Sequence, residues 1–196
     1  MKVIGITGGM ASGKSTIARM IANDRFPHLD ADEVVHQLMA TDASTIEAIG
    51  QAIPGSVVQG AVSRAQLSAA IANDARYIHT LEAILHPRVR AKEEQAIATG
   101  QAEGKAALIL DIPLLFETGA DVLCDVVITA SAPEAVRKAR AFARPGMTEA
   151  KWQRLIARQW TDAQRNARAD VVIDTTKTME ETQAKLKVLL KEWGLA

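Results

Sequence analysis

One stretch near the start of the chain, GITGGMASGKST at residues 5–16, limits what the chain can fold into. It fits the pattern G-x-x-x-x-G-K-S/T from Gly8 to Ser15, with an apolar run before it and an amphipathic pattern after it. Glycines let the backbone curl so that successive N–H groups point at phosphate oxygens, and a following helix adds its positive N-terminal dipole. The sequence therefore predicts a strand, a phosphate-binding loop and a helix, in that order.

Within this loop, Lys14 is expected to reach the β- and γ-phosphates of a nucleoside triphosphate and to act in catalysis, and the Ser15 hydroxyl to bind Mg²⁺. The residues expected to bind the triphosphate are Gly9, Met10, Ala11, Ser12, Gly13, Lys14, Ser15 and Thr16.

Short apolar runs alternate with longer helical patterns along the chain. The runs cover residues 3–7, 26–30, 107–112, 126–130 and 171–174, and several are apolar at nearly every position. Strands buried on both faces have this pattern, and its alternation with helices is typical of an α/β fold. We expect a P-loop NTPase-type three-layer fold: a five-stranded parallel sheet with helices on both faces.

Two segments interrupt this alternation within what we expect to be a single domain, residues 1–196. Residues from about 32 to 100 read as almost wholly helical and predict an inserted helical substrate-binding lobe, with helix starts at Ser63 and at His86-Pro87. Residues from about 134 to 168 predict a basic helical lid, made of helices over 134–144 and 148–165 that are joined at Pro145-Gly146.

Composition narrows the class of protein. Lys plus Arg and Asp plus Glu both number 23, so the net charge favours neither nucleic acid nor a membrane surface as partner. Cys124 is the only cysteine, which excludes an internal disulfide and favours a reducing compartment. We expect a cytoplasmic protein, a monomer or small homo-oligomer, with no membrane partner.

Three acidic residues follow expected strands. Asp30 and Asp32 lie at the edge of the sheet that carries the phosphate loop, and because they alternate along the chain only one can readily face the cleft. Asp32 could take the proton of an attacking hydroxyl, or it could cap the next helix. Asp111 ends an apolar strand and could bind Mg²⁺. The residues after it, 112–117, stay largely apolar and form either a buried turn or a wall for a substrate.

Seven arginines crowd residues 137–168. Arg140 and Arg144 are four residues apart, so we expect them to share a helix face that closes over the γ-phosphate. Arg140 would act in catalysis and Arg144 in binding ATP. The others are expected to be solvated: Arg137, Arg154, Arg158, Arg165 and Arg168.

Taken together, these features resemble the dephospho-CoA kinase family. The segments that carry the resemblance are GITGGMASGKST, DADEVVHQL, LHPRVR, DIPLLFE and RADVVID, in this order between residues 3 and 174. The resemblance implies a P-loop kinase with a helical substrate lobe and a lid. It also implies that ATP, with Mg²⁺, phosphorylates the ribose 3′-hydroxyl of dephospho-CoA, the final step of coenzyme A synthesis. A nucleoside or nucleotide kinase is the nearest alternative, whereas a regulatory GTPase would need an Asn-Lys-x-Asp sequence that is absent.

The resemblance also implies roles for individual residues. Asp32 would be the general base, and the acceptor site would be lined by Asp32, His86, Arg90, Pro113, Leu114 and Glu117. The chain departs from the family in three places. Ala11 replaces a usual glycine, at a position that we expect to be unrestricted; Thr175 follows VID where Asn is usual; and the lid is longer by one residue near Pro145.

Overall fold

The computed structural model describes residues 1–23 and 25–195 and divides into two compact units. The sheet unit comprises Met1–Asp30 and Ala96–Ala196, and the helical unit comprises Ala31–Gln95.

The sheet unit contains five parallel strands in the order β2-β5-β1-β6-β7, which confirms the predicted sheet. Their bounds are β1 (Lys2–Gly8), β2 (His28–Asp30), β5 (Ala107–Asp111), β6 (Val126–Ser131) and β7 (Val171–Asp174). Strand β1 is central, and its Ile4 pairs with Ile109 on one side and Val126 on the other. The phosphate loop therefore begins at the end of the middle strand.

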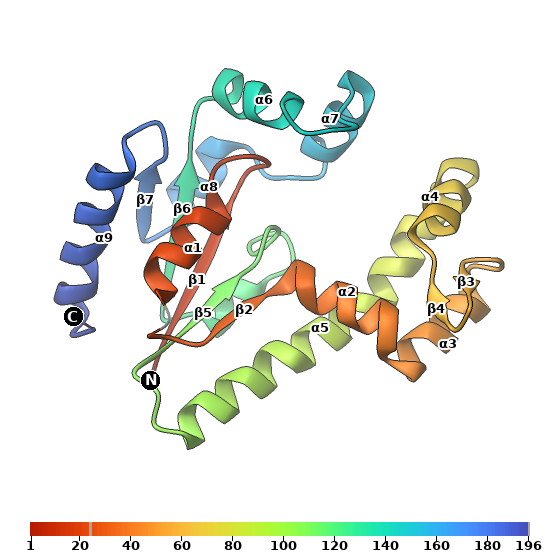
Figure 1. Cartoon of the computed structure of the whole chain (residues 1–196), viewed down its shortest axis with the longest axis horizontal. Helices are drawn as coiled ribbons and strands as arrows, with labels where there is room; N and C mark the ends of the chain where they lie inside the picture. The colour runs from red at the N-terminus through yellow and green to blue at the C-terminus, as the bar shows by residue number, and fades with distance from the viewer. Residues whose placement is uncertain (24, 196) are drawn as a thin grey trace. The chain divides into compact units, whose positions relative to one another are not determined.

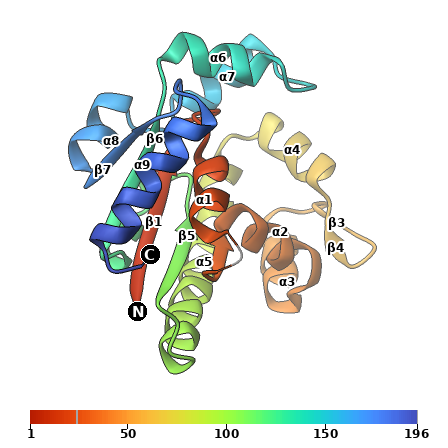
Figure 2. The same ribbon diagram turned by 60° about the vertical axis from the view of Figure 1, so that its left-hand side comes forward.

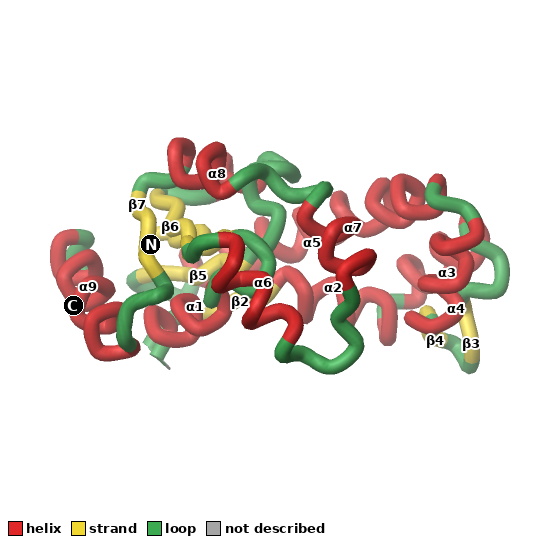
Figure 3. The backbone as a smooth tube through the Cα atoms, turned by 90° about the horizontal axis from the view of Figure 1, so that it is seen from above, coloured by secondary structure: helices red, strands yellow, loops and turns green. Residues whose placement is uncertain are grey.

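Helices cover both faces of this sheet, as predicted. Helices α1 (Lys14–Ala22) and α9 (Met179–Glu192) place Ile17, Ile21 and Leu186 in one core with Ile6 and Ile128 of the sheet. On the other face lie η1 (Ala120–Leu123) and α8 (Asp162–Arg168), which contact β1 and β6. Figure 3 shows the sheet between α8 and α1.

Three helices form the segment predicted as a lid: α6 (Glu134–Phe142), α7 (Glu149–Ile156) and α8. Figures 1 and 2 show α6 and α7 beyond the carboxyl ends of the strands. The single helix expected over 148–165 is wrong, because Thr161 caps a new helix by accepting the N–H of Gln164, whose side chain in turn accepts the N–H of Thr161. This capping box starts the second helix after Trp160, whereas the first helix has already ended at Ile156.

The helical unit contains α2 (Ala31–Thr41), α3 (Ala43–Ala52), α4 (Arg64–Asn73) and most of α5 (Arg76–Ala102). Its core contains Leu38, Ile49 and Leu67, and Ser63 caps α4 as expected. A short hairpin, β3 (Val57–Val58) with β4 (Ala61–Val62), was not predicted.

The helix start expected at His86-Pro87 is wrong, because Pro87 lies inside α5. A proline removes only one backbone N–H from the helix. Helix α5 is 27 residues long in total, and its Leu85 and Val89, on either side of Pro87, pack in the core of the helical unit. Packing on both sides of Pro87 outweighs the lost hydrogen bond. Helix α2 begins at Ala31, so Asp32 lies in its first turn and is not its cap.

Candidate active site

The phosphate loop turns sharply between β1 and α1. Gly13 has φ of 95°, a left-handed conformation that suits glycine, and it stands directly before the first residue of α1, Lys14. Within the turn, the N–H of Ser12 donates to the carbonyl of Gly9 at 3.0 Å. Ala11 has φ of 59°, so the expectation that this position is unrestricted is wrong. The loop holds an alanine in a conformation that glycine adopts without strain.

Lys14 forms an ion pair with the buried carboxylate of Asp111 at the end of β5. Burial raises the pKa of Asp111, but nearby His28 and the charge of Lys14 lower it by more, and the pKa lies below its usual value. The Nε2 of His28 is 3.7 Å from Oδ2 of Asp111. A carboxylate thus faces the loop lysine while it remains ionised. No group of three or more His, Cys, Asp or Glu residues that could hold a metal occurs among residues 1–23 and 25–195.

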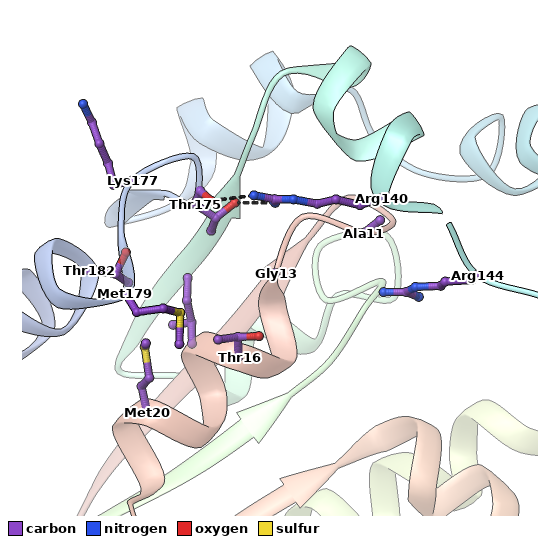
Figure 4. A pocket seen from close by; sticks show the side chains of 11 residues that line it. Ala11, Gly13, Thr16, Met20, Arg140, Arg144, Thr175, Lys177, Met179 and Thr182 are labelled. Carbon is purple, nitrogen blue, oxygen red and sulfur yellow. Dashed lines mark hydrogen bonds between the residues drawn. The ribbon is translucent and has the colours of Figure 1, made fainter. Parts of the chain in front are cut away.

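A cavity of about 330 Å³ adjoins the loop (Figure 4). Ile17, Met20 and Met179 make part of its wall apolar, and Arg140 and Arg144 make another part basic. Its other lining residues are Ala11, Gly13, Thr16, Thr175, Lys177 and Thr182. The structure therefore brings both expected arginines to the same cavity as part of the phosphate loop.

The expectation that the two arginines share a helix face is wrong. Helix α6 ends at Phe142, and Arg144 lies two residues beyond it, where its N–H donates to the carbonyl of Ala141. Arg140 instead stays in the last turn of α6, and its guanidinium donates to Thr175 (Figure 4). The approach of Arg144 to the cavity depends on the turn after the helix.

Two arginines that were expected to be solvated are buried against the phosphate loop. Arg137 is 6 % exposed and Arg165 is 1 % exposed, and both donate to the carboxylate of Asp162, at 2.7 and 2.5 Å. We call these three residues the arginine–aspartate cluster. A Cβ on Gly9 would lie 2.6 Å from Arg165 Nη2 and 2.7 Å from Arg137 Nη1. The second glycine of the loop therefore leaves room for two guanidinium groups.

The loop is held at Met10 as well. Its carbonyl accepts a hydrogen bond from Arg137 Nη1 at 3.3 Å, and its N–H donates to Oε1 of Gln159 at 3.0 Å. Residues after α7 therefore contact a backbone amide of the phosphate loop. Neither Gln159 nor Asp162 was predicted from the sequence; the i, i+3 spacing of Asp162 and Arg165 is the one local signal that it offers.

The segment after β5 packs against the same region. Phe116 stacks on Trp160, with ring centroids 5.5 Å apart, and Oε1 of Glu117 accepts the N–H of Trp160 at 2.7 Å. The carbonyl of Pro113 accepts the hydroxyl of Thr7 at 3.1 Å, and Leu114 is half-buried. In this structure Glu117 and Pro113 therefore accept hydrogen bonds from other residues of the chain, Trp160 and Thr7.

The remaining predicted residues, Asp32, His86 and Arg90, belong to the helical unit. His86 is exposed on α5, and Arg90 Nε lies 3.7 Å from the carboxylate of Glu93, a side chain that is almost fully buried. Their assignment to the acceptor remains a prediction.

A family model described as dephospho-CoA kinase matches residues 2–181. The chain belongs to the dephospho-CoA kinase family. A dephospho-CoA kinase of Rhodopseudomonas palustris is 41 % identical to it, over 97 % of this chain and 94 % of that protein. A dephospho-CoA kinase of Agrobacterium fabrum is 39 % identical over 99 % of both chains. These dephospho-CoA kinase relatives match both units of the chain.

Solved structures share this fold. TT1252 from Thermus thermophilus has a TM-score of 0.80 and 30 % identity over 97 % of each chain. Shikimate kinase from Bacteroides thetaiotaomicron, with a TM-score of 0.56 and 12 % identity over 99 % of each chain, shares the fold. The dephospho-CoA kinase fold seen here is thus a P-loop kinase fold.

Among the described residues, no helix is both long and apolar enough to cross a membrane.

Proposed function

We propose that this chain transfers the γ-phosphoryl group of ATP to the ribose 3′-hydroxyl of dephospho-CoA, which gives coenzyme A. The observation that carries the proposal is the match of the dephospho-CoA kinase family over residues 2–181, which includes the phosphate loop and the segments proposed for the acceptor. The contact of Lys14 with Asp111 and the basic wall of the cavity support it.

The triphosphate would be bound by the backbone N–H groups of residues 9–16 and by Lys14. Arg140 and Arg144, which line the adjoining cavity, would neutralise the negative charge that the three phosphates bring. Closure of residues 134–168 as a lid would exclude water that otherwise hydrolyses ATP.

Ser15 and Asp111 are the proposed Mg²⁺ ligands, and the residues fit this role. Oδ2 of Asp111 is buried and has no hydrogen-bond partner in the described part of the chain, and hydroxyl and carboxylate oxygens are ligands that Mg²⁺ accepts. When bound, Mg²⁺ supplies positive charge to the transferring phosphate.

Asp32 is the proposed general base: it would orient the 3′-hydroxyl and take its proton as the phosphate is transferred. The residues proposed to line the acceptor site with it are His86, Arg90, Pro113, Leu114 and Glu117. Residues 32–100 would then serve as the substrate-binding lobe. The single cysteine supports a cytoplasmic enzyme, and the balanced charge supports one that does not bind nucleic acid. We propose a monomer or small homo-oligomer.

The test is an ADP-release assay with Mg-ATP that compares dephospho-CoA with AMP, adenosine and shikimate, with the product mass read in parallel. ADP release with a gain of one phosphate on dephospho-CoA alone is expected. Turnover of a different acceptor while dephospho-CoA stays inert would refute the proposal. In the same assay Asp32→Asn should abolish turnover and leave ATP affinity nearly unchanged; a near-normal rate would remove Asp32 as the base.

A further inference from the structure

Thr175, where the chain departs from the family pattern, has a fixed backbone. It directly follows β7, and its N–H donates to the carbonyl of Ser131 at 2.9 Å. This bond continues the parallel ladder one residue past the pair of Ser131 with Asp174. The sheet therefore sets where the side chain of Thr175 begins.

The hydroxyl of Thr175 joins the end of β7 to the phosphate loop. Its Oγ1 donates to the carbonyl of Ser12 at 2.5 Å, a shorter contact than the 3.2 Å to the carbonyl of Ser131, and Ser12 is 1 % exposed. A hydroxyl has one proton to donate and two lone pairs that accept. Once the proton is directed at the loop, the lone pairs of the oxygen are available to a cation.

Arg140 supplies that cation. Its Nη1 donates to Oγ1 of Thr175 at 3.1 Å and its Nη2 donates to the carbonyl of Thr175 at 2.7 Å (Figure 4). Two parallel bonds from a planar guanidinium fix its orientation more tightly than one bond does. Both residues line the cavity beside the loop, so the guanidinium is held at the cavity wall.

We propose that Thr175 is a positioning residue for Arg140: its hydroxyl and carbonyl hold the guanidinium beside the phosphate loop before a nucleotide binds. The inference rests on the proposed function, because it gives Arg140 the role of stabilising the transferring phosphate. Alignment of this kind matters for rate, since a displacement of about 1 Å in a catalytic group costs up to about 100-fold. Loss of the hydroxyl should therefore affect kcat more than the KM for ATP.

Thr175→Val tests this, because valine keeps the shape of threonine and removes the hydroxyl. We expect kcat to fall about 10-fold or more and the KM for ATP to change by less than about threefold. Thr175→Ser, which keeps the hydroxyl, should restore kcat to within about threefold of the parent. Thr176→Val is the matched control: it makes the same exchange at the next residue, whose hydroxyl bonds Asp174, and should leave kcat unchanged.

The role of Arg140 is tested by making Thr175→Val in an Arg140→Ala background, with thermal melts of each variant as a check on folding. There the valine should cost less than about twofold in kcat, because its effect acts through the missing guanidinium. An equal cost in both backgrounds would make Thr175 a merely structural residue and overturn the inference. A normal or raised kcat in the single variant, or a serine variant as slow as the valine one, would also overturn it.

Failure of the proposed function is read separately. If the parent protein does not phosphorylate dephospho-CoA, that proposal fails, and the inference is decided by thermal melts of the parent, the two single variants and the double variant. Thr175→Val should lower the melting temperature more with Arg140 present than in the Arg140→Ala background, because the bond between the hydroxyl and the guanidinium is lost only in the first case. An equal lowering in both backgrounds would overturn the inference.

Discussion

Replacing Asp162 by Asn should destabilise the protein strongly, because this carboxylate is shared by two buried arginines. The side chains of Arg137 and Arg165 are 7 % and 1 % exposed, whereas that of Asp162 is 28 % exposed. Removing one partner of a fully buried ion pair costs about 3–5 kcal/mol, and the partial exposure of Asp162 reduces this to about 2–3 kcal/mol. A chain of this size should then melt about 5–10 °C lower.

The matched control is Asp121→Asn. Asp121 also accepts a hydrogen bond from an arginine, Arg168, at 2.8 Å, but that guanidinium is 62 % exposed. Exposed pairs of this kind contribute about 0.2–1 kcal/mol. Melting both variants by circular dichroism in low and high salt is the assay; the deficit of Asp162→Asn should persist in salt, because buried charges are screened less. A difference of less than 2 °C between the two melting temperatures would mean that Asp162 stabilises the protein no more than an exposed pair does, by ~1 kcal/mol. That result would refute the reasoning about the cluster.

Three further predictions concern the loop and the helical unit. Lys14→Ala removes the partner of Asp111 and should lower kcat at least about 100-fold with weaker ATP binding; unchanged steady-state kinetics would contradict the loop assignment. Ala11→Gly removes the strain of a left-handed alanine, about 1–2 kcal/mol, and this exceeds the about 0.4–1 kcal/mol by which glycine favours the unfolded chain through its entropy. The melting temperature should therefore rise by about 2 °C, and a fall would contradict this prediction. Burial raises the pKa of Glu93 despite Arg90, so its protonated form favours folding; relative to the parent, Glu93→Gln should gain stability as pH rises from 4 to 7 in thermal melts, and a gap constant with pH would count against this.

The sheet could be predicted because burial on both faces leaves a plain mark on a sequence. Residues 107–111 and 126–130 are apolar at almost every position, and both are buried strands beside β1. The phosphate loop was equally clear, since its glycines and Lys14 have fixed spacing. These features depend on short stretches of chain, and short stretches are what a single sequence displays.

The buried arginines could not be predicted in this way. Arg137 and Asp162 are 25 residues apart, and nothing in the sequence around either indicates that they meet. An arginine on a helix is ordinarily solvated. Its burial becomes favourable only when a carboxylate and backbone carbonyls accept hydrogen bonds from the guanidinium N–H groups. That compensation is tertiary, because it arises where two helices, α6 and α8, meet the phosphate loop.

The predicted helix boundaries were wrong where local and tertiary effects compete. Pro87 is a strong signal for a helix start, yet packing of the helical unit carries α5 through it. The break before Thr161 was missed because Ile156 and Trp160, four residues apart, keep a helical spacing across it. The roles of Asp32, His86 and Arg90 stay predictions, since they concern a bound acceptor.

The helical unit is a single uninterrupted stretch of chain, Ala31–Gln95, with a hydrophobic core of its own. Substitutions inside that core leave the sheet contacts of β1 and β5 intact, because those strands form a separate cluster around Ile4 and Ile109. On the proposed roles, Asp32, His86 and Arg90 lie in this stretch, whereas residues 113, 114 and 117 lie outside it, so a change of acceptor in evolution would need substitutions on both sides of its bounds. The residues proposed to bind the phosphates lie wholly outside the stretch, and they could be inherited unchanged through such a change.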